Sequence, residues 1–212
     1  VYTRGTVISS NTDLKEETFG LYGSLTPNAS VPQPYFNASA TVNADLTATI
    51  SPLQYWPGLL NASMKFFSWY PYSDANAPTA SFTDPGEMVL NYTANESAAN
   101  HIDVLAAISG PVWVEGVNIH FYHTLTKVTF TFKKVAPVPN EVTIEQIEFQ
   151  NVGKSGNLAM TEIPTTTTKN GKPKFVWSDV ATGKVTSTPT GNKTVTEDAT
   201  LICLLYTSDA AD

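Results

Sequence analysis

The sequence predicts an all-β protein with a sandwich architecture. Only 15% of its 212 residues are charged, while 42% are hydrophobic and 11% are aromatic. Low charge combined with abundant Thr, Val, Phe and Tyr favours strands, because branched and aromatic side chains fit a pleated, half-buried surface. Short alternating runs are separated by turns rich in Pro, Gly and Asn, which is typical of β-sandwiches, and helix patterns are scarce.

The first half of the chain holds several short runs that fit strands. They lie near residues 6–8, 18–22, 46–50, 64–70 and 88–90. The stretch 98–107 is the best helix candidate, but its second part fits a strand equally well. The linker pattern Ser109-Gly-Pro predicts a boundary near Gly116. It divides the chain into an N-terminal β-sandwich domain, residues 1–116, and a partial second domain, residues 117–202.

The clearest strand is VNIHFYHTLTKVTFTFKK, residues 117–134. Its apolar residues follow a two-residue period, but the parity changes partway along the run. Such a change requires one inserted residue or a break in the strand. We therefore expect a bulge near residue 126, or two strands that meet there. The side chains expected to point inward are Phe121, His123, Leu125, Phe130 and Phe132.

The second half of the chain continues in the same style. Further strands are expected at residues 142–149, 175–177 and 195–202. Gly153 and Gly156 bracket an expected turn. Lys169-Asn-Gly-Lys fits an exposed hairpin tip with a type I′ Asn-Gly turn.

The ending CLLYTSDAAD, residues 203–212, differs in composition from the Thr-, Val- and Asn-rich chain before it. A transposase mosaic end followed by the start of a common sequencing adaptor encodes this peptide in one reading frame. The first adaptor base also completes a codon for Ile202. We therefore expect residues 203–212 to be a translated adaptor artefact that is not native and lacks stable packing.

The sequence argues against several classes of function. The net charge is −7, and no basic cluster suggests nucleic acid binding. The absence of a phosphate loop, a nucleophile elbow and a metalloprotease motif predicts no catalysis and no cofactor. His120 and His123 resemble a metal pair, but on a strand their odd spacing places them on opposite faces. We expect His123 to form an inward hydrogen bond and His120 to face outward, without metal.

Two aromatic clusters stand out, Tyr55-Trp56-Pro57 and Phe66-Phe-Ser-Trp-Tyr-Pro71. Core packing is the favoured interpretation, because aromatic clusters dominate sandwich cores. An exposed, coplanar pair of Trp56 and Trp69 would instead form a platform on which a glycan stacks. A surface glycan-binding β-sandwich module is therefore kept as an alternative function.

Arg4 stands in a small, polar stretch, VYTRGTVISS, before the first clear strand. An exposed arginine near a terminus is a natural site for a trypsin-like protease, although many surface arginines have no such role. Residues 6–9 have the branched character of an edge strand, and Arg4 lies just outside them.

Several motifs, in order and at fitting spacings over about residues 3–160, resemble the fimbrillin (Mfa-like or FimA-like) family of the Bacteroidales. The first motifs are Arg4, Phe19-Gly-Leu-Tyr, Tyr55-Trp56-Pro57, an aromatic strand that ends in Tyr70-Pro71, and Asp103-Val-Leu-Ala-Ala. The most specific motif comprises Phe121, His123, Leu125, Lys127 and Val128. An Ile-x-x-Ile strand and a Gly turn follow, with Ile144, Ile147 and Gly156.

The resemblance implies two tandem transthyretin-like (Greek-key) β-sandwiches, the second one incomplete. It implies a non-catalytic subunit of a type V-like pilus, either in the stalk or as a tip or accessory adhesin. It also implies export as a lipoprotein precursor to the outer membrane. In the stalk mechanism an arginine-specific protease removes an N-terminal strand, here at Arg4, and the groove accepts a strand of another subunit. A host or bacterial surface receptor or glycan is a further implied partner.

Overall fold

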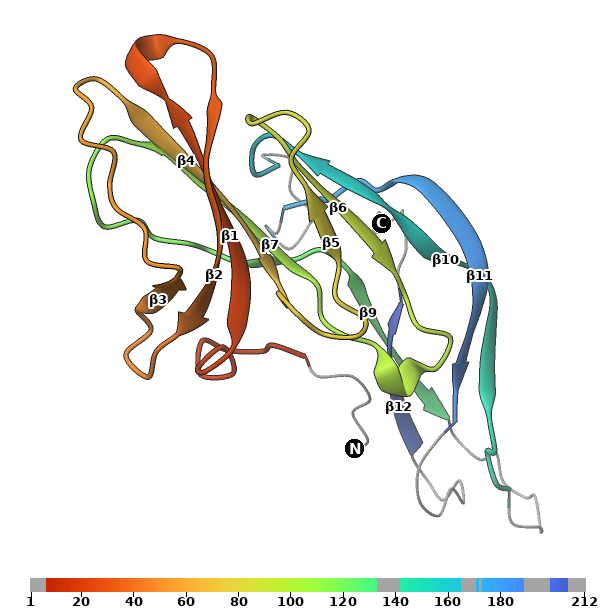
Figure 1. Cartoon of the computed structure of the whole chain (residues 1–212). Helices are drawn as coiled ribbons and strands as arrows, with labels where there is room; N and C mark the ends of the chain where they lie inside the picture. The colour runs from red at the N-terminus through yellow and green to blue at the C-terminus, as the bar shows by residue number, and fades with distance from the viewer. Residues whose placement is uncertain (1–6, 133–141, 165–170, 172, 189–198, 206–212) are drawn as a thin grey trace.

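The structure is a computed structural model that describes residues 7–132, 142–164, 171, 173–188 and 199–205. It is an all-β sandwich, as the sequence predicts (Figure 1). The only helical elements in these residues are two single turns of 3-10 helix, η1 (Pro27–Ala29) and η2 (Ala98–Asn100).

Two antiparallel sheets form the sandwich. The larger sheet has six strands in the order β3-β2-β1-β4-β7-β8. They are β1 (Thr18–Thr26), β2 (Gln33–Val42), β3 (Ala48–Ser51), β4 (Ser63–Tyr70), β7 (Leu105–Val112) and β8 (Tyr122–His123). The smaller sheet has four strands in the order β11-β10-β6-β5. They are β5 (Thr79–Ser81), β6 (Met88–Thr93), β10 (Ile147–Met160) and β11 (Ser178–Ser187). A separate pair consists of β9 (Thr126–Phe132) and β12 (Ala199–Leu205).

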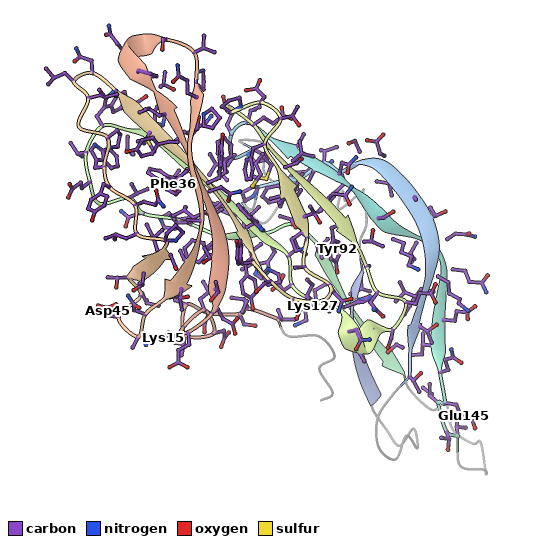
Figure 2. The ribbon with its side chains drawn as sticks, in the orientation of Figure 1. Lys15, Phe36, Asp45, Tyr92, Lys127 and Glu145 are labelled. Carbon is purple, nitrogen blue, oxygen red and sulfur yellow. The ribbon has the colours of Figure 1, made fainter. Side chains whose placement is uncertain are left out.

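The main core lies between the two sheets. Phe67 and Trp69 of β4 pack in one buried cluster with Leu90 and Tyr92 of β6. Tyr92, labelled in Figure 2, is 2% exposed and packs in this cluster with residues of both sheets. Gly20 of β1 leaves room for Trp69, because a Cβ at this position would lie 2.1 Å from the indole ring. Trp69 therefore serves as core packing, which is the favoured interpretation of its aromatic run.

The six-stranded sheet is also apolar on its other face, which we call the outer face. Phe19 and Leu21 of β1 and Met64 and Phe66 of β4 are buried there in a second cluster. Antiparallel sheets commonly leave one face to solvent, but here irregular segments cover it. Their apolar side chains in this cluster are Ile8, Leu14, Trp56, Val117, Ile119 and Phe121.

Two expected strands are irregular segments in the structure. Residues 7–9 form no strand, because the backbone N–H of Ile8 binds a side-chain carboxylate instead of a neighbouring strand. Residues 175–177 form no strand either, although Phe175 and Trp177 are buried in the main core. Both segments bury apolar side chains without a ladder, and an alternating pattern alone does not separate that arrangement from a strand.

The expected long strand at residues 117–134 is divided. Residues 117–121 are irregular, and β8 and β9 belong to different sheets. The alternative of two strands that meet near residue 126 is therefore correct. The predicted inward positions of Phe130 and Phe132 concern side chains that lie outside the described part of the chain.

Other details of the second half also differ from expectation. β10 continues without a break through Gly153 and Gly156, where a turn was expected. Its pairing with β11 shifts register in this region. Of the expected hairpin tip at residues 169–172, only Gly171 is described, with a φ of +71°. The stretch 98–107 contains η2 and then the start of β7, so the strand alternative is correct for its second part.

The ending and the domain boundary stay predictions. β12 continues to Leu205, which pairs with Thr126 of β9. Residues 203–205 therefore belong to a strand, although the ending was expected to lack stable packing. A backbone ladder accepts almost any side chain, and the adaptor origin of residues 203–212 remains a prediction.

Strand pairing also crosses residue 116, since β6 pairs with β10 and β7 pairs with β8. The division into residues 1–116 and 117–202 stays a prediction as well.

Candidate functional site

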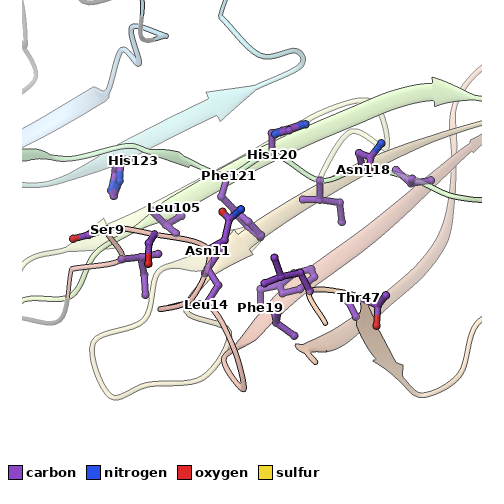
Figure 3. A pocket seen from close by; sticks show the side chains of 17 residues that line it. Ser9, Asn11, Leu14, Phe19, Thr47, Leu105, Asn118, His120, Phe121 and His123 are labelled. Atoms are coloured by element: carbon purple, nitrogen blue, oxygen red, sulfur yellow. The ribbon is translucent and has the colours of Figure 1, made fainter. Parts of the chain in front are cut away.

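The outer face of the six-stranded sheet carries a cleft of about 590 Å³. Residues 8–14 form one wall, and residues 117–123 form another (Figure 3). Phe19 of β1 and Leu105 of β7 contribute apolar surface from the sheet itself. Phe121 meets Phe19 edge to face, with their ring centroids 5.2 Å apart. The polar lining residues include no Asp, Glu, Lys or Arg; they are Ser9, Ser10, Asn11, Thr47, Asn118, His120 and His123.

A second cleft of about 430 Å³ adjoins the first on the same face. The two clefts share Phe19, Ala48, Val117 and Ile119 as lining residues. Trp56 packs on the sheet here, with its ring 6.4 Å from that of Phe66. The two clefts together make a hollow with an apolar floor on the sheet and polar residues among the irregular chain that borders it.

Residues 8–17, which we call the N-terminal cover, are tied to the sandwich at both ends. At the first end, the N–H of Ile8 donates to Asp103 Oδ2 at 3.0 Å. At the second end, Val42 of β2 exchanges backbone hydrogen bonds with Glu16 and Glu17, at 2.8 and 2.9 Å. Between them, Asp13 accepts the N–H groups of two serines, and the bond from Ser9 is the main cause that lowers the Asp13 pKa. The N-terminal cover is thus an ordered segment that hydrogen bonds fix to the sandwich.

Asp103 is the buried charge that holds the first end of the cover. Its side chain is 1% exposed, whereas that of His123 is 44% exposed. Oδ2 accepts the Ile8 N–H, and Oδ1 lies 2.9 Å from Nδ1 of His123. Each oxygen therefore has a partner, which a buried carboxylate requires. The expected hydrogen bond of His123 is present, although the ring reaches solvent, and His120 is exposed as expected.

The six-stranded sheet has open edges beside these clefts. β8 pairs only with Leu105 and Ala106 of β7, so within the described residues no strand pairs with positions 107–112 on that side. Residues 117–121 lie there instead, and Ser109 Oγ donates to the carbonyl of Asn118 at 2.7 Å. A side-chain bond thus stands where a backbone ladder is absent.

Several of the residues singled out in the sequence border the clefts, Phe19, Phe66 and His120 among them. Tyr55, Trp56 and Pro57 line the smaller cleft, and Phe121 and His123 line the larger one. Tyr55 is 76% exposed, whereas Trp56 is partly buried against the outer cluster. The family motifs around Trp56 and Phe121, which are far apart in sequence, therefore meet the same sheet face.

The other singled-out residues lie elsewhere. Tyr70 is buried at the end of β4 beside Pro71, and burial raises the pKa of Tyr70. Leu125 packs against the main core instead of the outer face, and Lys127 is exposed on β9. Arg4 lies outside the described residues.

The sequence did not single out Ile8, Leu14 or the buried role of Asp103. A signal was present for Asp103, since it precedes an apolar run, Val-Leu-Ala-Ala, that enters the core. In the part of the chain that the structure describes, no group of three or more His, Cys, Asp or Glu side chains is placed to hold a metal ion. No helix among these residues is long and apolar enough to cross a membrane.

Together, the sandwich and its hollowed second face define a β-sandwich protein with an apolar sheet face beside a strand edge that no described strand pairs with. The family model described as fimbrillin-like matches residues 3–210, and the chain belongs to this family. Membership implies a fimbrial structural subunit at the cell surface that associates with other fimbrial subunits, in a family that is generally non-enzymatic. No significant match was found among curated proteins or among solved structures.

Proposed function

We propose that this protein is a fimbrial subunit that assembles by strand exchange after arginine-specific processing. The observation that carries the proposal is the apolar outer face of the six-stranded sheet, which irregular segments close only in part. An apolar face beside an unpaired edge is a template for an additional strand. An incoming strand gains ladder hydrogen bonds and buries alternate side chains in the clefts.

The acceptor edge is the part of β7 at residues 107–112. Six residues of antiparallel strand span about 20 Å, which is enough for three side chains on the outer face. The incoming strand displaces residues 117–121, which are held beside β7 by packing and by the bond between Ser109 and Asn118. This exchange replaces irregular chain by ladder hydrogen bonds, which give the new contact its stability. They come from residues other than Pro111, which has no N–H to donate.

The processing site is Arg4, the only arginine in the sequence. A cut after Arg4 releases the segment before it and leaves the N-terminal cover attached to the sandwich. After this cut, the strand of another subunit docks at the β7 edge in place of residues 117–121. The subunit reaches the outer membrane of its bacterium, a member of the Bacteroidales, as a lipoprotein precursor, and serves in the stalk or as a tip or accessory adhesin that binds a surface receptor.

The alternative of a glycan-binding module on Trp56 and Trp69 has less support. Trp69 is 5% exposed and belongs to the main core, so it is not available for stacking beside Trp56.

The test uses the protein encoded by the complete gene, treated with an arginine-specific protease. Wild type should form ladders of oligomers after treatment, and Arg4→Lys, which keeps the charge but removes the cleavage site, should stay monomeric. Equal behaviour of the two proteins would count against processing at Arg4. A cut at Arg4 without any oligomer would count against strand exchange.

A further inference from the structure

The hydrogen bond between Ile8 and Asp103 joins two residues that are 95 positions apart in the chain. Ile8 is 5% exposed and packs in the buried cluster on the outer face of the six-stranded sheet. Packing therefore holds its side chain, and the hydrogen bond to Asp103 holds its N–H. Val7, just before it, is only partly buried. Ile8 is therefore the position at which the described chain enters the folded body.

Asp103 is suited to accept the Ile8 N–H because the orientation of its carboxylate is fixed by a second contact. The Nδ1 atom of His123 lies 2.9 Å from Oδ1, which orients the carboxylate and leaves Oδ2 for the Ile8 N–H. A hydrogen bond to an ionised acceptor is roughly twice as strong as one between neutral groups. The side chain is 1% exposed, so little water competes for the same oxygen.

The other end of the N-terminal cover depends on different contacts. The backbone bonds of Glu16 and Glu17 with Val42 hold that end on β2. If the Ile8 anchor is lost, the cover is held by this end and by the packing of its apolar side chains, and the exposed turn that contains Lys15 opens more often. The anchor thus decides whether residues 8–15 resist a protease.

We propose that Asp103 is a positioning residue for the N-terminal cover. Its carboxylate anchors Ile8, keeps the cover on the larger cleft, and protects the chain after the anchor from proteolysis. Lys15 lies seven residues downstream of Ile8. The anchoring of Ile8 does not rest on the proposed function.

The test measures cleavage after Lys15 by a lysine-specific protease, followed by mass spectrometry. Asp103→Ala should raise the initial rate at Lys15 at least about tenfold, because a hydrogen bond to a charged group contributes about 1.5–3 kcal/mol and 1.4 kcal/mol is tenfold. Hydrogen exchange at the Ile8 amide should rise by a similar factor. Asp103→Asn keeps an oxygen acceptor, so it should restore much of the protection.

The matched control is Val185→Ala, a truncation at a residue that is 1% exposed in a third cluster, away from the cover. It lowers overall stability but should leave the Lys15 rate within about twofold of wild type. If Asp103→Ala does not fold, Ile8→Ala tests the same anchor from its other side and should also speed cleavage. Equal Lys15 rates in wild type and in the anchor variants, or an equal rise in Val185→Ala, would overturn the proposal.

The two proposals fail in different ways. Failure of cleavage at Arg4, or of oligomer formation, contradicts the proposed function and leaves the Lys15 result unaffected. Unchanged protection of Lys15 in Asp103→Ala contradicts the anchor and leaves strand exchange unaffected.

Discussion

Replacing Phe121 by Ala distinguishes a displaceable cover from a true core. Phe67 is 0% exposed between the sheets, so Phe67→Ala should cost about 3–5 kcal/mol. Phe121 is only partly buried and borders the larger cleft, so its truncation enlarges an existing hollow. We expect Phe121→Ala to lower the free energy of unfolding by about 1 kcal/mol, because the Phe121 side chain is only about half removed from water. The lost edge-to-face contact with Phe19 should lower it by about 1 kcal/mol more. The sum is about 2 kcal/mol.

The assay is equilibrium unfolding in urea, followed by tryptophan fluorescence, for wild type and both variants. The free energies are comparable if the slope of the unfolding free energy with urea is the same for all three proteins. A cost for Phe121→Ala as large as that for Phe67→Ala would mean that residues 117–121 are closed core, and it would contradict their replacement by another strand.

Three further predictions concern the packing and the charges. Gly20→Ala should destabilise the fold by about 1–3 kcal/mol, because the new methyl group overlaps the ring of Trp69, and a change below about 0.5 kcal/mol in urea unfolding would contradict this. His123→Ala should cost about 1–3 kcal/mol, since it leaves one oxygen of buried Asp103 without its partner; His123→Asn, which keeps a donor, should cost less. Burial raises the pKa of Tyr92 from 10.0 to about 12, so its contribution to stability should be full below pH 10 and be lost as the pH rises through 12. An ultraviolet titration in which Tyr92→Phe removes a tyrosinate that forms near pH 10 would contradict it.

Much of the six-stranded sheet follows from local patterns in the sequence. In β4, successive residues such as Phe66 and Phe67 point to opposite faces, and the aromatic run predicts a strand that is buried on both sides. The strand ends at Tyr70 before Pro71, which has no N–H to continue the ladder. Strand positions that depend on nearest neighbours in sequence were therefore predictable.

The site was less predictable because it depends on contacts between distant segments. Ile8 looks like a strand residue, and only the buried carboxylate of Asp103 explains why it is not one. Leu125 shares the parity of Phe121 but packs against the other core, since the chain leaves the first sheet after His123. Periodicity fixes the relative direction of neighbouring side chains, but it does not say which sheet a strand joins.

Hydrogen exchange on assembled subunits tests strand exchange at the outer face most directly. The protein from the complete gene is cut at Arg4, allowed to form oligomers, and compared with uncut monomer by exchange and mass spectrometry. We expect the amides of residues 107–112 that do not face β4 to gain protection in the oligomer, Pro111 having none, while those of residues 117–121 change as that segment leaves the edge. Protection gained only along β5 or β11, at the edges of the smaller sheet, would contradict it.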